Sequence, residues 1–406
     1  MGRVIQRIGS PKVDTGNRLS FKVRALDLKI NGSEVRSPIR VVNQQEMSSK
    51  ANLPSEIAVE TPIGIMDVRV SNDRLSNFLT NNGYVSRLIG KLQTNYPMFI
   101  HFPFKGILIQ PTDEANTTLS NNSKLRNNFY RLTWQITQFT EFNAYILPFI
   151  QSPLSELKKM IKKFLENNFE SNKEIIVSID PSYKKINELL RFIDNELVQT
   201  KTINSVSILN RSLKSNLISY NNIWDTFYER RIMMLGVGLD RALADFYNLS
   251  GPHLESFFVG DAFSLRTFKA FSSEEKPVEA MTKFFLKKNL TVSKFSEILT
   301  SYKNFDNFVD EIISDFDKTG QKDKEYIKKS LNNWQSINDE TDKGKRVKKI
   351  RIFSSLSKVH EIISSNKEFS VVQDYIRKNE AEDYIKQQSV LKKVISSTKL
   401  FPFFKK

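Results

Sequence analysis

The chain has 406 residues, more than the roughly 250 to 300 that one hydrophobic core usually supports, so a large domain with an appended module is expected. Its 39% hydrophobic and 26% charged residues are typical of a folded protein and exclude a disordered or fibrous chain. Lys and Arg number 61 against 45 Asp and Glu, and this net charge of +16 favours nucleic acid as a partner, although an AT-rich genome alone would supply part of the excess.

Residues 18–42 predict a small β-meander. Residues 19–25 and 33–37 alternate apolar and polar side chains, a pattern typical of strands with one buried face. Between them, Asn31 and Gly32 form a dipeptide that favours the tight turn of a hairpin.

Short apolar runs and amphipathic segments then alternate as far as residue 259. The runs are bounded by Pro, Gly or Asn and predict buried strands at 38–42, 64–70, 97–102, 106–109, 174–179, 205–209, 231–235 and 256–259. Apolar residues at three- and four-residue steps predict helices at 72–92, 122–140, 154–169, 182–197, 224–228 and 239–247. About seven or eight strand–helix units predict a (β/α)8, TIM-like barrel over residues 1–276.

From residue 277 to 406 amphipathic helical patterns dominate, which predicts a second, helical module. Its densest charge is a basic run of five cations within seven positions: Lys345, Arg346, Lys348, Lys349 and Arg351. Such a run is either a surface that contacts phosphates or a solvated helix face, and the sequence leaves both open.

Several kinds of chemistry are excluded or disfavoured by composition. The chain has no cysteine, which excludes disulfides, a thiolate nucleophile, iron–sulfur clusters and cysteine-ligated zinc. The histidines at 101, 253 and 360 lie in unrelated contexts, so we expect no metal site and no cofactor. With neither a signal-peptide pattern at the start nor an apolar stretch of about 18 residues, we expect a cytoplasmic protein without a membrane anchor.

Carboxylates remain as the candidate catalytic groups. In a (β/α)8 barrel the reacting side chains stand at the carboxyl ends of strands, and Asp113, Asp180 and Asp261 each follow an apolar run. Two carboxylates in one pocket suit glycosidic chemistry. The alternative for each is a helix cap or turn residue, most of all for Asp180, which Pro181 and Ser182 follow.

Two segments resemble the tRNA-guanine transglycosylases, including their archaeal and DNA-directed relatives. Residues 21–43 are similar to the family's opening β-sheet and first barrel strand. Arg231–Gly238 is similar to its Leu-Met-Gly-Val-Gly strand and loop, and is followed by Phe257–Asp261. The resemblance covers residues 18–270 loosely.

The resemblance implies a barrel enzyme that exchanges guanine for a 7-deazaguanine base in DNA or tRNA. It implies Asp261 as the nucleophile, Asp113 or Asp180 as the proton-handling carboxylate, and Gly236, Val237 and Gly238 as the loop against the base. The family's Asp-Ser-Gly-Gly-Phe-Gln stretch and its zinc site are absent, and residues 106–113 are only the approximate place of the former.

Three functions are therefore open. The first is base exchange through a covalent Asp–glycosyl intermediate; the second is a catalytically inactive barrel that binds nucleic acid or a partner protein; the third is an unrelated sugar hydrolase. Two carboxylates about 5 to 8 Å apart in a basic-rimmed pocket would favour catalysis, and an isolated Asp261 would favour the binding subunit. A homodimer is also left open.

Overall fold

The computed structural model of this chain describes residues 4–7, 11–14, 23–57, 59, 61–167, 173–209, 213–239, 260–265, 277–287, 290–302 and 304–388. Within these residues, nine strands form one sheet in the order β6-β14-β13-β12-β11-β10-β9-β8-β7, and every pairing between them is parallel. The strands are β6 (Ile39–Arg40), β7 (Val42–Asn43), β8 (Ile63–Val70), β9 (Phe104–Pro111), β10 (Ala144–Ile146), β11 (Glu174–Ile179), β12 (Ser205–Leu209), β13 (Met233–Leu239) and β14 (Ala262–Leu265).

The sheet curls until its two ends nearly meet. Strand β6 pairs with β14 and β7 pairs with β8, yet only Val41 separates β6 from β7 in the chain. The backbone N–H of Val41 donates to the carbonyl of Phe263 at 2.8 Å, which keeps this segment against β14. The fold is therefore α/β and barrel-like, as the alternating pattern predicted.

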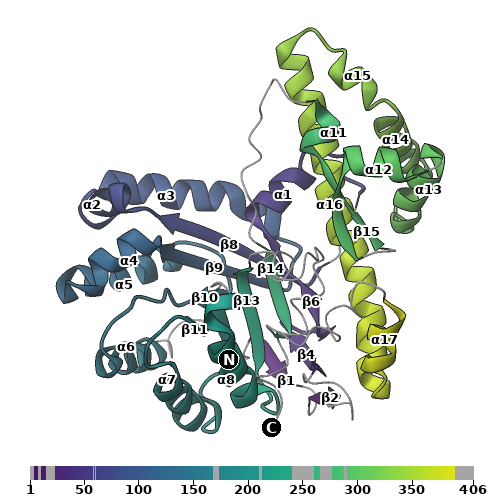
Figure 1. The fold of residues 1–406 in the computed structure, drawn as a ribbon. Helices are drawn as coiled ribbons and strands as arrows, with labels where there is room; N and C mark the ends of the chain where they lie inside the picture. The colour runs from purple at the N-terminus through teal and green to yellow at the C-terminus, as the bar shows by residue number, and fades with distance from the viewer. Residues whose placement is uncertain are drawn as a thin grey trace.

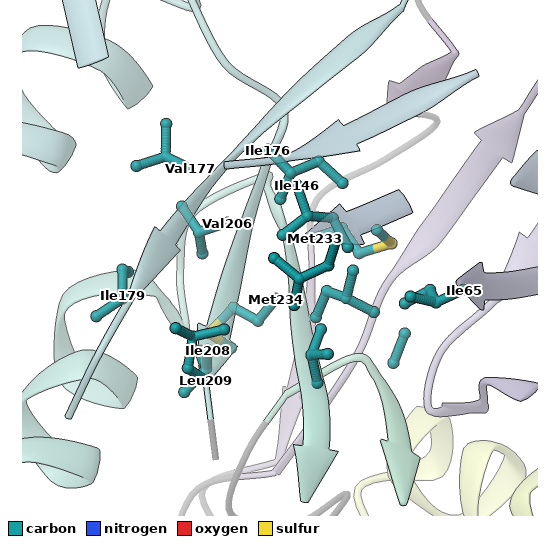
Figure 2. Close-up of a cluster of buried hydrophobic side chains, with 14 of the residues drawn as sticks. Ile65, Ile146, Ile176, Val177, Ile179, Val206, Ile208, Leu209, Met233 and Met234 are labelled. Atoms are coloured by element: carbon teal, nitrogen blue, oxygen red, sulfur yellow. The ribbon is translucent and has the colours of Figure 1, made fainter. Parts of the chain in front are cut away.

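Helices follow the strands and cover the outside of the sheet (Figure 1). The strands they cover have buried residues throughout, as in β11 and β12. Figure 2 shows a cluster of buried apolar side chains from these and neighbouring strands. The helices are α1 (Gln44–Lys50), α2 (Asn72–Thr80), α3 (Asn82–Asn95), η1 (Tyr96–Phe99), α4 (Asp113–Ser120), α5 (Ser123–Gln138), α6 (Leu154–Asn167), α7 (Ile186–Phe192), η3 (Ile193–Val198) and α8 (Leu213–Phe227).

The N-terminal strands form the predicted hairpin beside the barrel. β4 (Asp27–Ile30) and β5 (Ser33–Arg36) pair antiparallel around Asn31 and Gly32, whose φ values of 45° and 88° are the left-handed conformation that this turn requires. β1 (Ile5–Arg7) pairs with the other edge of β4, and β2 (Lys12–Asp14) pairs with β3 (Val23–Ala25).

In the part of the C-terminal region that the structure describes, helices dominate and one hairpin is present, which the sequence pattern did not predict. β15 (Lys283–Leu286) and β16 (Thr291–Lys294) pair antiparallel, and the aromatic ring of Phe284 lies in a core built largely from the surrounding helices. The helices are α11 (Val278–Met281), α12 (Phe295–Ser301), α13 (Phe305–Asp315), α14 (Gln321–Asn332), α15 (Gln335–Asn338), α16 (Lys343–Lys378) and α17 (Ala381–Gln387).

Helix α16 joins the two regions. Its first half buries Phe353 and Leu356 in the C-terminal core, whereas its second half buries Phe369 and Val372 in the barrel core. Leu53, from the segment after α1, belongs to the C-terminal core as well. Each of the two predicted domains, residues 1–276 and 277–406, therefore contributes side chains to the core of the other.

The observed strands differ from the predicted ones in a few places. Residues 97–102 are not a strand but the end of η1 and a turn, in which Phe99 and Phe102 pack beside Gly64. β10 and β14 were not predicted, and the strand predicted at 256–259 and the helix at 239–247 lie almost wholly outside the described residues. In the described ranges no helix combines the length and apolar character needed to cross a membrane.

Candidate functional site

Strand register separates the outer face of the sheet from its inner face. The ring of Tyr145 lies 5.5 Å from that of Trp134 on α5, and Phe263 lies 5.2 Å from Phe369 on α16, so both side chains point outward to helices. Paired residues in neighbouring strands share a face, and alternate residues point the other way. Asp67, Arg69, Gln110, Ser178, Ser207 and Ser264 therefore lie on the inner face.

Asp261 lies immediately before β14, at the amino end of that barrel strand. The strand predicted at 256–259, whose carboxyl end it was expected to follow, lies outside the described residues. Its side chain is fully buried and is held by Arg24 of β3, whose Nε donates to Oδ1 at 2.9 Å and whose Nη2 donates to Oδ2. Two further donors reach the carboxylate: Ser37 Oγ at 3.2 Å from Oδ1 and the Met234 backbone N–H at 2.7 Å from Oδ2.

All three guanidinium nitrogens of Arg24 donate hydrogen bonds. Its guanidinium also donates to the carbonyls of Phe227, Tyr228, Arg230 and Ile232, which ties the N-terminal strands to the segment between α8 and β13. In β/α barrels the amino end of the strands carries stability, whereas chemistry resides at the carboxyl end. The placement of Asp261 thus favours a structural role, and its role as nucleophile stays a prediction.

Asp113 and Asp180 are at the carboxyl end of the barrel, after β9 and β11 respectively, away from Asp261. Asp113 is exposed in the first turn of α4. Asp180 is fully buried directly after β11, where its Oδ1 accepts from the backbone N–H of Ser182 at 2.9 Å and from the hydroxyl of Ser182 at 2.6 Å. These bonds are those of the turn residue considered as the alternative for Asp180.

The predicted base-contacting residues Gly236, Val237 and Gly238 lie within β13. Gly238 has a φ of +64°, and its N–H donates to the buried hydroxyl of Ser264 on β14 at 2.9 Å. A Cβ atom on Gly238 would lie 3.5 Å from Arg69 Nη2 and 3.8 Å from Asp67 Oδ2. The glycine therefore brings the β13 backbone next to a charged pair on β8.

That pair, Asp67 and Arg69, was not singled out from the sequence. Arg69 donates to Asp67 Oδ2 from Nε at 3.1 Å and from Nη2 at 2.8 Å, while Asp67 Oδ1 is buried without a hydrogen-bond partner in the described structure. The Arg69 side chain is 46% exposed and that of Asp67 24% exposed, so the pair is open to solvent near the carboxyl end of β8. In the sequence, the pair is indicated by two charged residues that alternate with apolar ones at the end of the run at 64–70.

The resemblance implies that residues 106–113 are the approximate place of the second catalytic carboxylate. In this stretch, β9 carries Gln110 on the inner face. Its amide is bound to the backbone of Phe149: Nε2 donates to the carbonyl at 2.8 Å, and Oε1 accepts from the N–H at 2.9 Å. Gln110 therefore fixes the segment after β10.

The basic run occupies the first turns of α16. Lys345, Lys348 and Arg351 are exposed, whereas Lys349 is ion-paired with Glu340 at 2.9 Å and Arg346 is half-buried. The three exposed cations are spaced at three-residue steps, which gathers them within about 120° of the helix surface. The run thus offers three exposed cations to a partner, at the start of the long helix α16 (Figure 1).

No protein-family model matches this chain, and a search of curated proteins finds no significant match. The resemblance described above therefore stands on the quoted segments alone.

Proposed function

We propose that this protein binds nucleic acid through its basic surface, on a barrel in which Asp261 is structural. The observation that carries the proposal is the cluster of exposed cations at the start of α16, in a chain whose net charge is +16. Lys and Arg on one helix face bind backbone phosphates and release counterions, which gives affinity without sequence readout.

The packing of α16 in both hydrophobic cores supports this proposal. The helix is 36 residues long and is buried in both cores, so the cations at its start are held in a fixed position relative to the barrel. A preorganised array of cations loses less conformational entropy on binding than a flexible tail would.

The arrangement of carboxylates supports binding over glycosyl transfer by the predicted residues. Asp261 lies at the amino end of its strand, away from Asp113 and Asp180, and its oxygens accept bonds from Arg24, Ser37 and Met234. A nucleophile must reach the anomeric carbon of a substrate, which this burial opposes. The barrel itself fits an eight-stranded, TIM-like count if residues 39–43 are taken as one strand, and with it the transglycosylase-like architecture.

Base exchange is the second candidate, and the pair beside Gly238 favours it. Asp67 has a carboxylate oxygen without a partner in the described structure, and Arg69 presents an exposed guanidinium. A guanine or 7-deazaguanine offers N–H groups to a carboxylate and acceptor atoms to a guanidinium, so this pair could hold such a base against the β13 backbone.

Incubation with labelled guanine and either tRNA or duplex DNA separates the two candidates. The proposal predicts that nucleic acid is bound and that no label enters it. Incorporation of label that is lost in Asp67→Asn would establish base exchange at the second candidate site, and incorporation lost in a folded Asp261→Asn would restore the nucleophile role of Asp261.

Replacing the three exposed cations of the basic run tests the proposed surface. In the variant Lys345→Gln, Lys348→Gln, Arg351→Gln, we expect weaker binding to unrelated sequences alike, and a plot of log K against log salt that flattens by about 0.7 to 0.9 for each phosphate that the protein no longer neutralises. Fluorescence anisotropy with labelled tRNA and duplex DNA measures both quantities. Gln keeps the helix propensity of the positions it replaces.

The charge-matched control replaces Lys91, Lys322 and Lys328, which are exposed and lie outside the run. It should keep the wild-type slope. If the basic-run variant also keeps the wild-type affinity and slope, the run is a solvated helix face and this proposal is wrong.

A further inference from the structure

A hollow of about 560 Å³ opens at the carboxyl end of the barrel, beside β10 and β11. One wall is the segment after β10 with the start of α6, including Ser152 and Lys158, and the other is the segment between β11 and α7, with Tyr183, Lys184 and Lys185. Helices α6 and α7 are neighbours in the structure, as Figure 1 shows. The hollow is therefore at the end of the barrel where β/α barrels bind their ligands.

Three lysines line this hollow. Lys184 and Lys185 are exposed, and Lys158 is half-buried with its ammonium 5.0 Å from the ring centre of Phe192. In the described structure none of the three is within ion-pair distance of a carboxylate, although other lysines of α6 and α16 are, such as Lys162 with Glu196 and Lys349 with Glu340. The hollow thus gathers three cations, of which Lys158 is, after the hydrogen-bonded Lys162, also close enough to Glu196 to help lower the pKa of that carboxyl group.

The walls are fixed to each other. The hydroxyl of Tyr183 donates to the carbonyl of Ser152 at 2.9 Å, and the Tyr183 ring meets the ring of Phe149 edge-on at 5.4 Å. Tyr183 is 8% exposed and forms part of the wall. The Asp180–Ser182 bonds hold the turn that leads into Lys184. The lysines are thus carried by backbone segments that are braced before any ligand arrives.

We infer that this hollow, which we call the β10–β11 pocket, binds a backbone phosphate of nucleic acid through Lys158, Lys184 and Lys185. The inference rests on the proposed function and gives it a second point of attachment, on the barrel itself. A phosphodiester carries one negative charge and oxygen acceptors only, so three ammonium groups outside ion-pair distance of any carboxylate in the described structure complement it in charge and in hydrogen bonding. No base contact is required, because phosphate contacts position a nucleic acid without reading its sequence.

The test compares two variants with the same loss of charge. The pocket variant is Lys158→Gln, Lys184→Gln, Lys185→Gln; the control is Lys91→Gln, Lys159→Gln, Lys163→Gln, in which two changes lie on the exposed side of the same helix α6. Binding of labelled tRNA and duplex DNA to the full-length chain is followed by anisotropy between about 50 and 200 mM salt, the range over which phosphate contacts dominate. Circular dichroism confirms that each variant is folded.

The pocket variant should bind several-fold more weakly, with a salt slope reduced by about 0.7 to 0.9 for each phosphate that it no longer neutralises, while the control stays near the wild-type slope. Equal weakening in both variants would mean that overall charge, not the pocket, holds the nucleic acid, and would overturn the inference. A pocket variant that binds like the wild type would also overturn it, while leaving the proposed function in place. A wild-type chain that binds neither nucleic acid contradicts the proposed function itself.

Discussion

Asp261→Asn is expected to lower the free energy of unfolding by about 3 to 5 kcal/mol, because it leaves the Arg24 guanidinium buried without its counter-charge. Both side chains of the pair are 0% exposed, so water cannot replace the lost carboxylate oxygen. The amide also retains only one acceptor oxygen for the bonds that Arg24, Ser37 and Met234 now make. Urea-induced unfolding followed by circular dichroism measures the change.

Asp113→Asn is the matched control, because Asp113 is exposed on α4 and the same chemical change there should cost less than about 1 kcal/mol. An Asp261→Asn protein as stable as the wild type would show that the ion pair with Arg24 is not a structural requirement. That result, together with lost guanine incorporation, would assign chemistry to Asp261.

The second large effect is expected from Phe369→Ala on α16, with a loss of about 3 to 5 kcal/mol in the free energy of unfolding. Phe369 is 1% exposed, and its ring meets that of Phe263 on β14 at 5.2 Å and 79°, which fastens the helix to the barrel. Val371→Ala, two residues away on the exposed side at 39% exposure, should change stability by about 0.5 kcal/mol or less. Similar, small effects of both changes would mean that this half of α16 is not docked on the barrel.

The barrel-like fold was predictable because a strand buried on both faces has a continuous apolar run as its sequence. The runs at 174–179 and 205–209 match β11 and β12 residue for residue. By contrast, β10 is only three residues long, too short to give a pattern of its own. The apolar run at 97–102 was misassigned because Phe99 and Phe102 are buried by packing beside Gly64, which burial alone cannot distinguish from a strand.

The site was less predictable, because its features depend on contacts between distant segments. Asp261 follows an apolar run and so was placed at a strand end, whereas the barrel strand begins at Ala262 and its partner Arg24 lies 237 residues earlier. Asp67 and Arg69 became candidate site residues only from the fold, in which Gly238 of β13 lies beside them. The lysines of the β10–β11 pocket come from two segments, and neither segment alone stands out in a lysine-rich chain.

The most direct test of nucleic-acid binding by this chain is the salt dependence of the affinity of the wild-type protein for tRNA and for duplex DNA of unrelated sequence. Phosphate binding by the exposed cations predicts measurable binding to at least one of them, similar for unrelated sequences of that kind. It also predicts that log K falls linearly with log salt, with a slope that corresponds to about three or more neutralised phosphates. Binding that is absent at about 50 mM salt, or that does not change between about 50 and 200 mM, would contradict it.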